Sequence, residues 1–271
     1  MQKRKQKIIK QLKILYFTSE QSFYINCLRV KCFLAGKQLV HFLHIGKTGG
    51  TAFIEAIQDI GLLKKAPRKI KFAETDDYII CIHNHSFALK NVPIGEKSFF
   101  FVRDPIKRFI SGFYGRKRED KPRYNIPWSS QEKEAFLNFD TPNDLALALE
   151  SNDEKTRRSA LKAMRSIQHV STFLSGWTGD SKYLKAREDD ILFIGFQDNL
   201  DVDVLHLGKI LDFPAHFQLP KDDVKTHKNP SSFSTDLSTD AYNNLKKWYS
   251  KDFKILETCK EIANTKKECY K

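Results

Sequence analysis

The sequence predicts an α/β fold of the P-loop-like kind, in three layers, with a central parallel sheet between helices and further helices inserted. Two observations predict this fold. Short, mostly apolar runs fit strands that are buried on both faces of a parallel sheet. Segments with apolar residues at helical spacing follow several of these runs, and a glycine-rich turn joins the first run to its helix.

The first elements of the domain follow in order. A strand is expected over residues 39–45, a glycine-rich turn over 46–50, and a helix over 51–60, where apolar residues lie three and four apart. Gly61 is expected to end this helix. Two further strands are expected over residues 78–82 and 98–102.

The second half of the chain is mostly helical. Asp104 and Pro105 mark the start of a helix with an apolar stripe. After a polar loop over residues 116–131, helix starts are expected at Ser130 and Thr141. The last expected elements are a strand over 191–196, a helix over about 199–211 and a helix from about 239 into the 250s.

Composition and charge narrow the class of protein. With 271 residues, of which 41% are hydrophobic and 29% charged, the chain is a folded globular protein and not a disordered, collagenous or coiled-coil one. Its 46 Lys and Arg against 33 Asp and Glu give a net charge of +13. This charge favours an anionic ligand or partner: a nucleic acid, an acidic lipid, a polyanionic sugar or a phosphorylated cofactor.

The positive charge is concentrated near the N-terminus. Residues 1–40 contain nine Lys or Arg and one acidic residue, so they carry +8 of the net charge of +13. We therefore divide the chain into a basic N-terminal arm, residues 1–37, and a single domain, residues 38–271. The arm is expected to be either a solvated segment or a weak contact with a membrane surface or another polyanion.

The sequence contains little evidence for a membrane-spanning segment, a signal peptide or disulfide bonds. No run reaches the ~20 apolar residues that a spanning helix needs, since Arg29 and Lys31 interrupt the best candidate, residues 23–36. The basic first residues lack the apolar core of a signal peptide. The five cysteines are an odd number and form no CxxC pair, which favours a reducing compartment. We expect a cytoplasmic protein that is peripheral to a membrane at most.

The glycine-rich turn has the chemistry of an anion site. Its glycines let the backbone approach a ligand closely, and the helix that follows directs free N–H groups at that ligand. A lysine adds positive charge and two threonines add hydroxyl donors. A Walker A loop would need glycine where His41 stands, so the turn departs from that of an ATPase. The residues concerned are Gly46, Lys47, Thr48, Gly49, Gly50 and Thr51.

A second anion site is expected after the strand over residues 98–102. Arg103 follows this strand and can bind a phosphate through two N–H groups, while Ser111 on the next helix can donate its hydroxyl. Lys107 lies one turn before Ser111 on the same helix face. Two anion sites on successive loops suggest a nucleotide with phosphates at both ends of its ribose.

These two segments carry a family resemblance. HIGKTGGT at 44–51 resembles the 5′-phosphosulfate-binding loop of sulfotransferases, and RDPIKRFISGF at 103–113 resembles their 3′-phosphate motif. The chain is similar to carbohydrate sulfotransferases such as the uronosyl 2-O-sulfotransferases and their bacterial relatives.

The resemblance implies a donor, 3′-phosphoadenosine 5′-phosphosulfate (PAPS), and no metal. The sulfuryl group would pass in line to a hydroxyl of a polysaccharide, an oligosaccharide or a glycolipid. The residues that would bind the donor are Lys47, Thr48, Gly49, Gly50, Thr51, Arg103, Ser111 and Lys228.

The resemblance also implies a histidine base between the two motifs, where His83-Asn84-His85 stands. A neutral imidazole near pH 7 is suited to take the proton of an attacking hydroxyl. His85 is the first choice, and His83 is the second choice or a partner that positions the base. Lys47 and the N–H groups of the glycine-rich turn would stabilise charge on the leaving phosphate oxygen.

Other polar residues are assigned lesser roles. His41 and His44 are expected to be structural residues of the first strand, and Glu55 and Glu74 are weaker candidates for the base. The resemblance implies that the loop over 225–229 closes over the nucleotide, although it could equally be a solvated loop. Residues 166–170 with Trp177 resemble the lining of an acceptor cleft. An acidic sugar could be held by Arg116, Lys117, Arg118, Arg123 and Trp128.

Two other functions compete with sulfuryl transfer. A P-loop kinase or NTPase would share the strand, turn and helix, but it lacks an evident magnesium carboxylate and does not explain Arg103 with Ser111. A non-catalytic polyanion-binding protein would explain the net charge, but no nucleic-acid-binding motif is present in the sequence.

Overall fold

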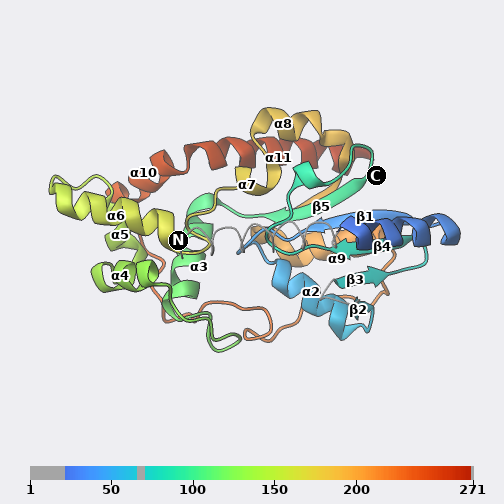
Figure 1. Ribbon diagram of the computed structural model, residues 1–271, viewed down its shortest axis with the longest axis horizontal. Helices are drawn as coiled ribbons and strands as arrows, with labels where there is room; N and C mark the ends of the chain where they lie inside the picture. The colour runs from blue at the N-terminus through green and yellow to red at the C-terminus, as the bar shows by residue number, and fades with distance from the viewer. Residues whose placement is uncertain (1–21, 66–70, 270–271) are drawn as a thin grey trace, which may run out of the picture.

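The computed structural model describes residues 22–65 and 71–269, and its centre is a six-stranded sheet with helices on both faces (Figure 1). The strands lie in the order β2-β3-β4-β1-β5-β6. Strands β4, β1, β5 and β6 run parallel, as the predicted α/β fold requires. Their bounds are β1 (Gln38–Leu43), β2 (Leu63–Lys65), β3 (Lys71–Glu74), β4 (Tyr78–Ile82), β5 (Lys97–Val102) and β6 (Ile191–Phe196).

The four parallel strands are the four that the apolar runs predict. Only the first differs materially, because β1 ends at Leu43 and not at residue 45. His44 therefore lies beyond the sheet, at the entrance to the glycine-rich turn, and not within the strand as expected. Along β1, Val40 and Phe42 face one core cluster while Leu39 and Leu43 face the other, so both faces of the strand are buried.

The two strands at one edge of the sheet are not predicted. β2 pairs antiparallel with β3, and β3 pairs antiparallel with β4, so the sheet is mixed and not wholly parallel. Lys64 and Lys65 are exposed on β2. Lysine is common on edge strands, where it discourages pairing with another chain, but it interrupts the apolar pattern that reveals a strand in a sequence.

Helices cover both faces of the sheet (Figure 1). On one face α2 (Gly50–Asp59) and α9 (Leu200–Ile210) pack against the sheet. Gly61, at φ 74°, follows the end of α2 as predicted. The opposite face is covered by a helix over 22–35, α7 (Ser175–Thr178), α8 (Ser181–Ala186) and α11 (Ser250–Cys269).

The helix over residues 22–35 belongs to the segment that the charge pattern assigns to the basic arm. Its Ile25, Leu28 and Cys32 are buried in the same cluster as β1 and β4, so this part of the arm is packed on the sheet. The rest of the arm before it, residues 1–21, lies outside the described residues.

A group of helices beside the sheet forms the third core cluster. The predicted starts are confirmed: α4 begins at Ser130, and the Thr141 hydroxyl caps α5 by accepting from the Asp144 N–H over 3.1 Å. The expected last helix is broken at Tyr249 into α10 and α11. The helices of this group are α3 (Pro105–Lys117), α4 (Ser130–Asn138), α5 (Pro142–Ala148), α6 (Glu154–Ser166) and α10 (Thr239–Trp248).

Short 3-10 turns complete the fold at η2 (Leu89–Asn91), η3 (Glu188–Asp190) and η4 (Gln197–Asn199). None of the helices within residues 22–65 and 71–269 combines the length and apolarity that crossing a bilayer requires. The cysteines of these ranges whose side chains are described are free thiols, namely Cys27, Cys32, Cys81 and Cys259.

Candidate active site

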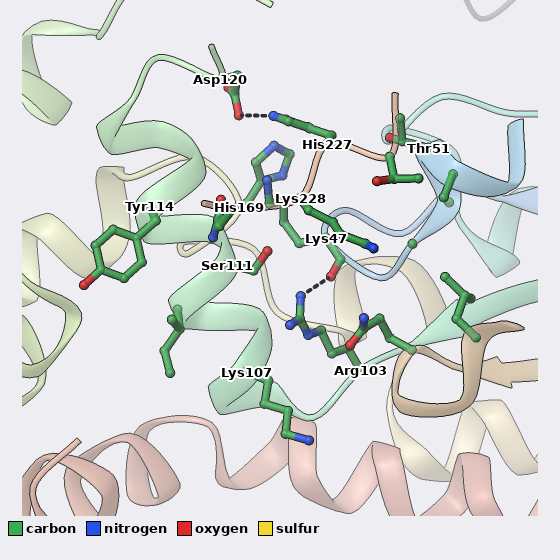
Figure 2. A pocket seen from close by; sticks show the side chains of 18 of the residues that line it. Lys47, Thr51, Arg103, Lys107, Ser111, Tyr114, Asp120, His169, His227 and Lys228 are labelled. Carbon is green, nitrogen blue, oxygen red and sulfur yellow. Dashed lines mark hydrogen bonds and ion pairs between the residues drawn. The ribbon is translucent and has the colours of Figure 1, made fainter. Parts of the chain in front are cut away.

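The two sequence motifs line one pocket of about 970 Å³ (Figure 2). The pocket lies beyond the carboxyl ends of β1 and β5, the edge at which parallel α/β sheets bind ligands. The predicted donor-binding residues in its lining are Lys47, Gly49, Gly50, Thr51, Arg103, Ser111 and Lys228. Thr48 is instead buried beneath the turn, where its hydroxyl donates to the Ile45 carbonyl oxygen over 2.9 Å. The Thr48 side chain therefore braces the loop.

The glycines of the turn are required by close neighbours. A Cβ at Gly46 would lie 2.7 Å from Nδ1 of His169, and a Cβ at Gly50 would lie 2.4 Å from the His44 ring. Gly49 has φ 96°, in the left-handed region, and a Cβ there would meet Leu200 at 2.4 Å. Only glycine lets the turn fit between these side chains.

The turn leads directly into the N-terminus of α2. Gly49 is its N-cap residue and provides no side-chain hydrogen bond to the first turn. Gly50, Thr51 and Ala52 line the pocket, so the positive end of this ten-residue helix faces it. The helix start thus offers N–H groups to an anion.

Lys47 has an unusual environment. Its φ is 67°, and its side chain crosses to α3, where a Cβ at Gly115 would lie 2.6 Å from Nζ and 3.3 Å from Oδ1 of Asp120. Burial lowers the pKa of Lys47 to about 8, with Asp120 opposing this shift and nearby arginines, Arg118 first, adding to it. Gly115 and Asp120 thus shape the site, although neither is apparent from the motifs.

Arg103 and Ser111 line the same pocket, and Arg103 lies beside the turn (Figure 2). Nη1 of Arg103 donates to the Lys47 carbonyl oxygen over 3.5 Å, which ties the two motifs together. Lys107, on the same helix as Ser111, forms an ion pair with Asp198 over 2.8 Å. Burial lowers the pKa of Arg103, which remains a cation at neutral pH.

Buried polar atoms without hydrogen-bond partners gather at this pocket. Six such side-chain atoms occur in the described part of the chain, and four belong to residues that line the pocket. These four are Arg103 Nε, Asp120 Oδ1, His227 Nε2 and Asn229 Oδ1. Asp120 Oδ1 and His227 Nε2 face each other over 3.5 Å without a hydrogen bond, whereas Arg103 Nε and Asn229 Oδ1 have no such neighbour among the described residues. Folded proteins pair nearly all such atoms, so these two indicate a site for a polar ligand.

His85 lines the pocket with its ring held in one orientation. Nδ1 lies 2.7 Å from the His44 carbonyl oxygen. Since that oxygen can only accept, Nδ1 carries the proton, and Nε2 of the neutral ring carries the lone pair. Desolvation lowers the pKa of His85 below 6.5; the bond to His44 opposes this shift, and the charges of Lys47 and Arg108 add to it. The ring is therefore a neutral proton acceptor near pH 7.

Two more imidazoles accompany His85. The His44 ring lies 4.2 Å from it and the His169 ring 5.6 Å, between centroids. Burial lowers the pKa of both rings well below 6.5. The apolar run predicts His44 as a structural residue of the first strand, but β1 ends at Leu43 and the His44 ring lies at the pocket.

His83 has a different environment. It is 2% exposed, stacks on Phe87 at 3.5 Å between ring centroids, and lies away from the pocket lining. Its Nε2 is 2.9 Å from Nδ1 of His41, whose Nε2 donates to Glu96 over 2.7 Å. Together with Cys81, these two histidines are the group within the described residues whose ligand atoms, all within 4.8 Å of one another, could hold a metal ion.

The alternative bases are engaged elsewhere. Glu55 forms an ion pair with Arg123 over 2.6 Å, and Glu74 is paired with lysines at the sheet edge. Hydrogen bonds from these lysines, Lys31 first, lower the pKa of Glu74 to about 2, which makes it a poor proton acceptor.

The predicted sugar-binding cluster is mostly structural. Arg116 is 1% exposed and forms ion pairs with Asp120 and Glu132, each over 2.7 Å. Trp128 donates its indole N–H to the Arg116 carbonyl oxygen over 2.6 Å. Lys117 pairs with Asp140. These groups brace the end of α3 and the loop after it, so they are not free to hold a sugar.

The loop over residues 225–229 lies at the pocket. Thr226, His227, Lys228 and Asn229 are among its lining residues, and His227 faces Asp120 over 3.5 Å (Figure 2). Burial lowers the pKa of His227 to about 4, and the Lys47 charge adds to this shift. The loop therefore lines the same pocket as the glycine-rich turn and Arg103, while its closure over a nucleotide stays a prediction.

Comparison with known proteins agrees with this geometry. The sequence model of the sulfotransferase family matches residues 30–257. No curated protein matches the chain. The matched range includes the glycine-rich turn, the Arg103 motif and His85, and it covers most of the sequence. The chain therefore belongs to the sulfotransferase family.

Proposed function

We propose that this sulfotransferase moves a sulfuryl group from PAPS to a carbohydrate hydroxyl, with His85 as the general base. The observation that carries the proposal is the hydrogen bond from His85 Nδ1 to the His44 carbonyl oxygen, because it leaves Nε2 as the proton acceptor. Lys47 and Arg103 line the same pocket, so an anionic donor and a base would meet there.

The residues present fit the donor. Arg103 Nε is buried without a partner in the described part of the chain, and added Cβ atoms would obstruct the close approach at Gly49 and Gly50. Lys47 and the α2 N-terminus would hold the 5′-phosphosulfate, and Arg103 with Ser111 would hold the 3′-phosphate. When bound, PAPS supplies an activated sulfuryl group.

The residues of the chain divide the remaining work. Nε2 of His85 takes the proton of the acceptor hydroxyl, while the His44 carbonyl oxygen orients the ring. Lys47 and the N–H groups at the start of α2 stabilise negative charge at the phosphate end of the site. A carbohydrate acceptor and a cytoplasmic location are supported by the sequence alone, through the resemblance to uronosyl 2-O-sulfotransferases and their bacterial relatives.

Two measurements test the proposal. In calorimetry, 3′,5′-adenosine bisphosphate should bind the wild type and His85→Ala alike, but should bind Lys47→Ala and Arg103→Ala much more weakly. With labelled PAPS and a panel of glycans, only the wild type should give a sulfated product, which mass spectrometry then maps. Absence of bisphosphate binding by the wild type contradicts the donor. Full transfer by His85→Ala contradicts the base.

The competing kinase or NTPase function has a simple test. In a thermal-shift assay, the bisphosphate should raise Tm while ATP at the same concentration should not. The reverse order would favour the kinase.

A further inference from the structure

The helix over residues 22–35 is apolar on its outer side as well as on the side that packs against the sheet. On the inner side, Ile25, Leu28 and Cys32 are buried. On the outer side, Phe23 is 69% exposed and Leu34 is 78% exposed. In Figure 1 this helix, in dark blue, lies at the opposite end of the long axis from α4, α5 and α6.

The outer residues form a continuous stripe. Residues 23, 27, 30 and 34 are separated by four, three and four positions, which places them on one side of a helix. They are Phe23, Cys27, Val30 and Leu34, and all are exposed. Phe33, 86% exposed, lies beside them. We call these five residues the outer stripe. An exposed row of large apolar side chains marks an interaction surface.

The surface beside the outer stripe carries excess positive charge. Glu74 forms ion pairs with Lys31, Lys37 and Lys64 over 2.5, 3.1 and 2.8 Å, so three ammonium groups surround one carboxylate. Lys31 belongs to the same helix as the stripe, and Lys64 is on the neighbouring edge strand β2. Lys65, next along β2, is exposed.

The chain leading into this helix is more strongly basic. Six of its first thirteen residues are Lys or Arg, and the segment contains no acidic residue before Glu20. This segment joins the helix nine positions after Lys13. Apolar side chains and basic residues together are the combination that holds a protein on an anionic lipid surface.

We propose that the helix over residues 22–35 lies on an anionic membrane surface. Phe23, Val30 and Leu34 insert below the headgroups, and Lys31 and Lys64 contact the lipid phosphates and carboxylates. The six Lys and Arg of residues 1–13 add positive charge that attracts the chain to such a surface. Charge favours this occupant over a second copy of the chain. Two copies joined at this stripe would bring together two segments that each carry +8 within residues 1–40.

The test uses the full chain and vesicles. Co-sedimentation compares vesicles of phosphatidylcholine alone with vesicles in which about a third of the lipid is phosphatidylserine, at about 0.15 M salt. We expect binding to the anionic vesicles at least about tenfold stronger. The double variant Phe23→Ser/Leu34→Ser should lose about tenfold or more of that binding. A variant with Lys3, Lys5, Lys7 and Lys10 changed to Gln should lose as much.

A matched control and four contrary outcomes complete the design. Leu137 on α4 is 77% exposed, and Leu137→Ser should bind the anionic vesicles as the wild type does. Equal binding to both vesicle types, or undiminished binding by the double variant, overturns the proposal. A dimer that the double variant dissociates, with no vesicle binding by the wild type, shows instead that the stripe joins two copies. If Tm falls markedly in the double variant but not in the other variants, the chain itself covers the outer stripe, and the proposal is overturned.

Discussion

The indole Nε1 of Trp177 donates a hydrogen bond to the backbone carbonyl oxygen of His85 over 2.7 Å. Trp177 is 4% exposed, and its ring lies 5.1 Å from the Arg108 guanidinium carbon. His85 is thus held at its main chain by Trp177 and at its ring by the His44 carbonyl oxygen. A residue that the sequence associates with the acceptor cleft therefore positions the proposed base.

Trp177→Phe removes this hydrogen bond while keeping an aromatic side chain. We expect kcat to fall about tenfold, because a less well positioned base raises the activation free energy of the chemical step by about 1.4 kcal/mol. Bisphosphate affinity should stay unchanged. Trp128→Phe is the matched control, since it removes an indole bond to the Arg116 carbonyl oxygen. Equal losses of kcat in the two variants would contradict a positioning role for Trp177.

His85→Ala should retain the fold and lose transfer activity by at least about 10²-fold, the usual contribution of a general base. Circular dichroism and Tm check the fold, and initial rates check the activity. Exposed His216 provides the control, as His216→Ala should be fully active. Because the His85 pKa is lowered below 6.5, the activity of the wild type should fall only below that pH, as the base becomes protonated.

Bisphosphate binding should weaken above about pH 8. Lys47 is a cation below its pKa of about 8 and neutral above it, so each further pH unit removes up to tenfold in affinity. Calorimetry from pH 7 to 9.5 measures this slope, and Lys47→Met should bind weakly with little dependence on pH. Asp120→Asn should move the loss of affinity to lower pH, because Asp120 raises the Lys47 pKa. A wild-type affinity that is constant over this range would contradict the assignment.

Gly49→Ala should abolish bisphosphate binding and destabilise the protein by about 2 kcal/mol or more. Its Cβ would lie 2.4 Å from Leu200, in a left-handed conformation that disfavours any side chain. Gly61→Ala is the control, because Gly61 has φ 74° but nothing within 4 Å of an added Cβ. It should cost only about 1 kcal/mol of backbone strain and bind normally. Urea unfolding and calorimetry compare the two variants.

The free energy of unfolding should fall as the pH drops below 6.5. Burial lowers the pKa of His44, His83 and His169 well below that value, so the unfolded chain binds protons that the folded chain refuses. Each such group removes at most about 1.4 kcal/mol per pH unit. Asp252 has the opposite effect, because burial raises its pKa to about 6 and the folded chain binds its proton more readily than the unfolded chain. Below pH 6 it therefore offsets the loss of stability from one of these histidines.

Urea unfolding at pH 7, 6 and 5 measures this slope. His169→Gln should lessen it, because this change removes one of the buried imidazoles. A free energy of unfolding that rises as the pH falls from 7 to 5 would contradict the prediction that neutral buried imidazoles dominate the pH dependence.

Apolar runs predicted the four parallel strands because a strand buried on both faces must be apolar throughout its length. The edge strand β2 escaped prediction, since its exposed lysines are tolerated where one side of a strand meets solvent. Its neighbour β3 is only four residues long and also begins with a lysine, so it leaves no clear apolar run in the sequence. The helix over residues 22–35 escaped prediction for a related reason. In the sequence its buried residues alternate with exposed apolar and basic residues, so no single apolar stripe marks the side that packs on the sheet.

The sequence by itself determined the class of fold, the two segments that line the pocket and the family, because glycines, arginine and serine at fixed positions form a pattern that is read locally. Only the tertiary structure decided between His85 and His83 as pocket residues, committed the Thr48 hydroxyl to the Ile45 carbonyl, and joined Asp120 to the Lys47 site. The physical reason is that burial, proton position and pKa depend on neighbours distant in the chain. A carbonyl oxygen 41 residues away holds the proton of His85 on Nδ1 and so leaves Nε2 as the proton acceptor. An indole 92 residues away holds the main chain of His85.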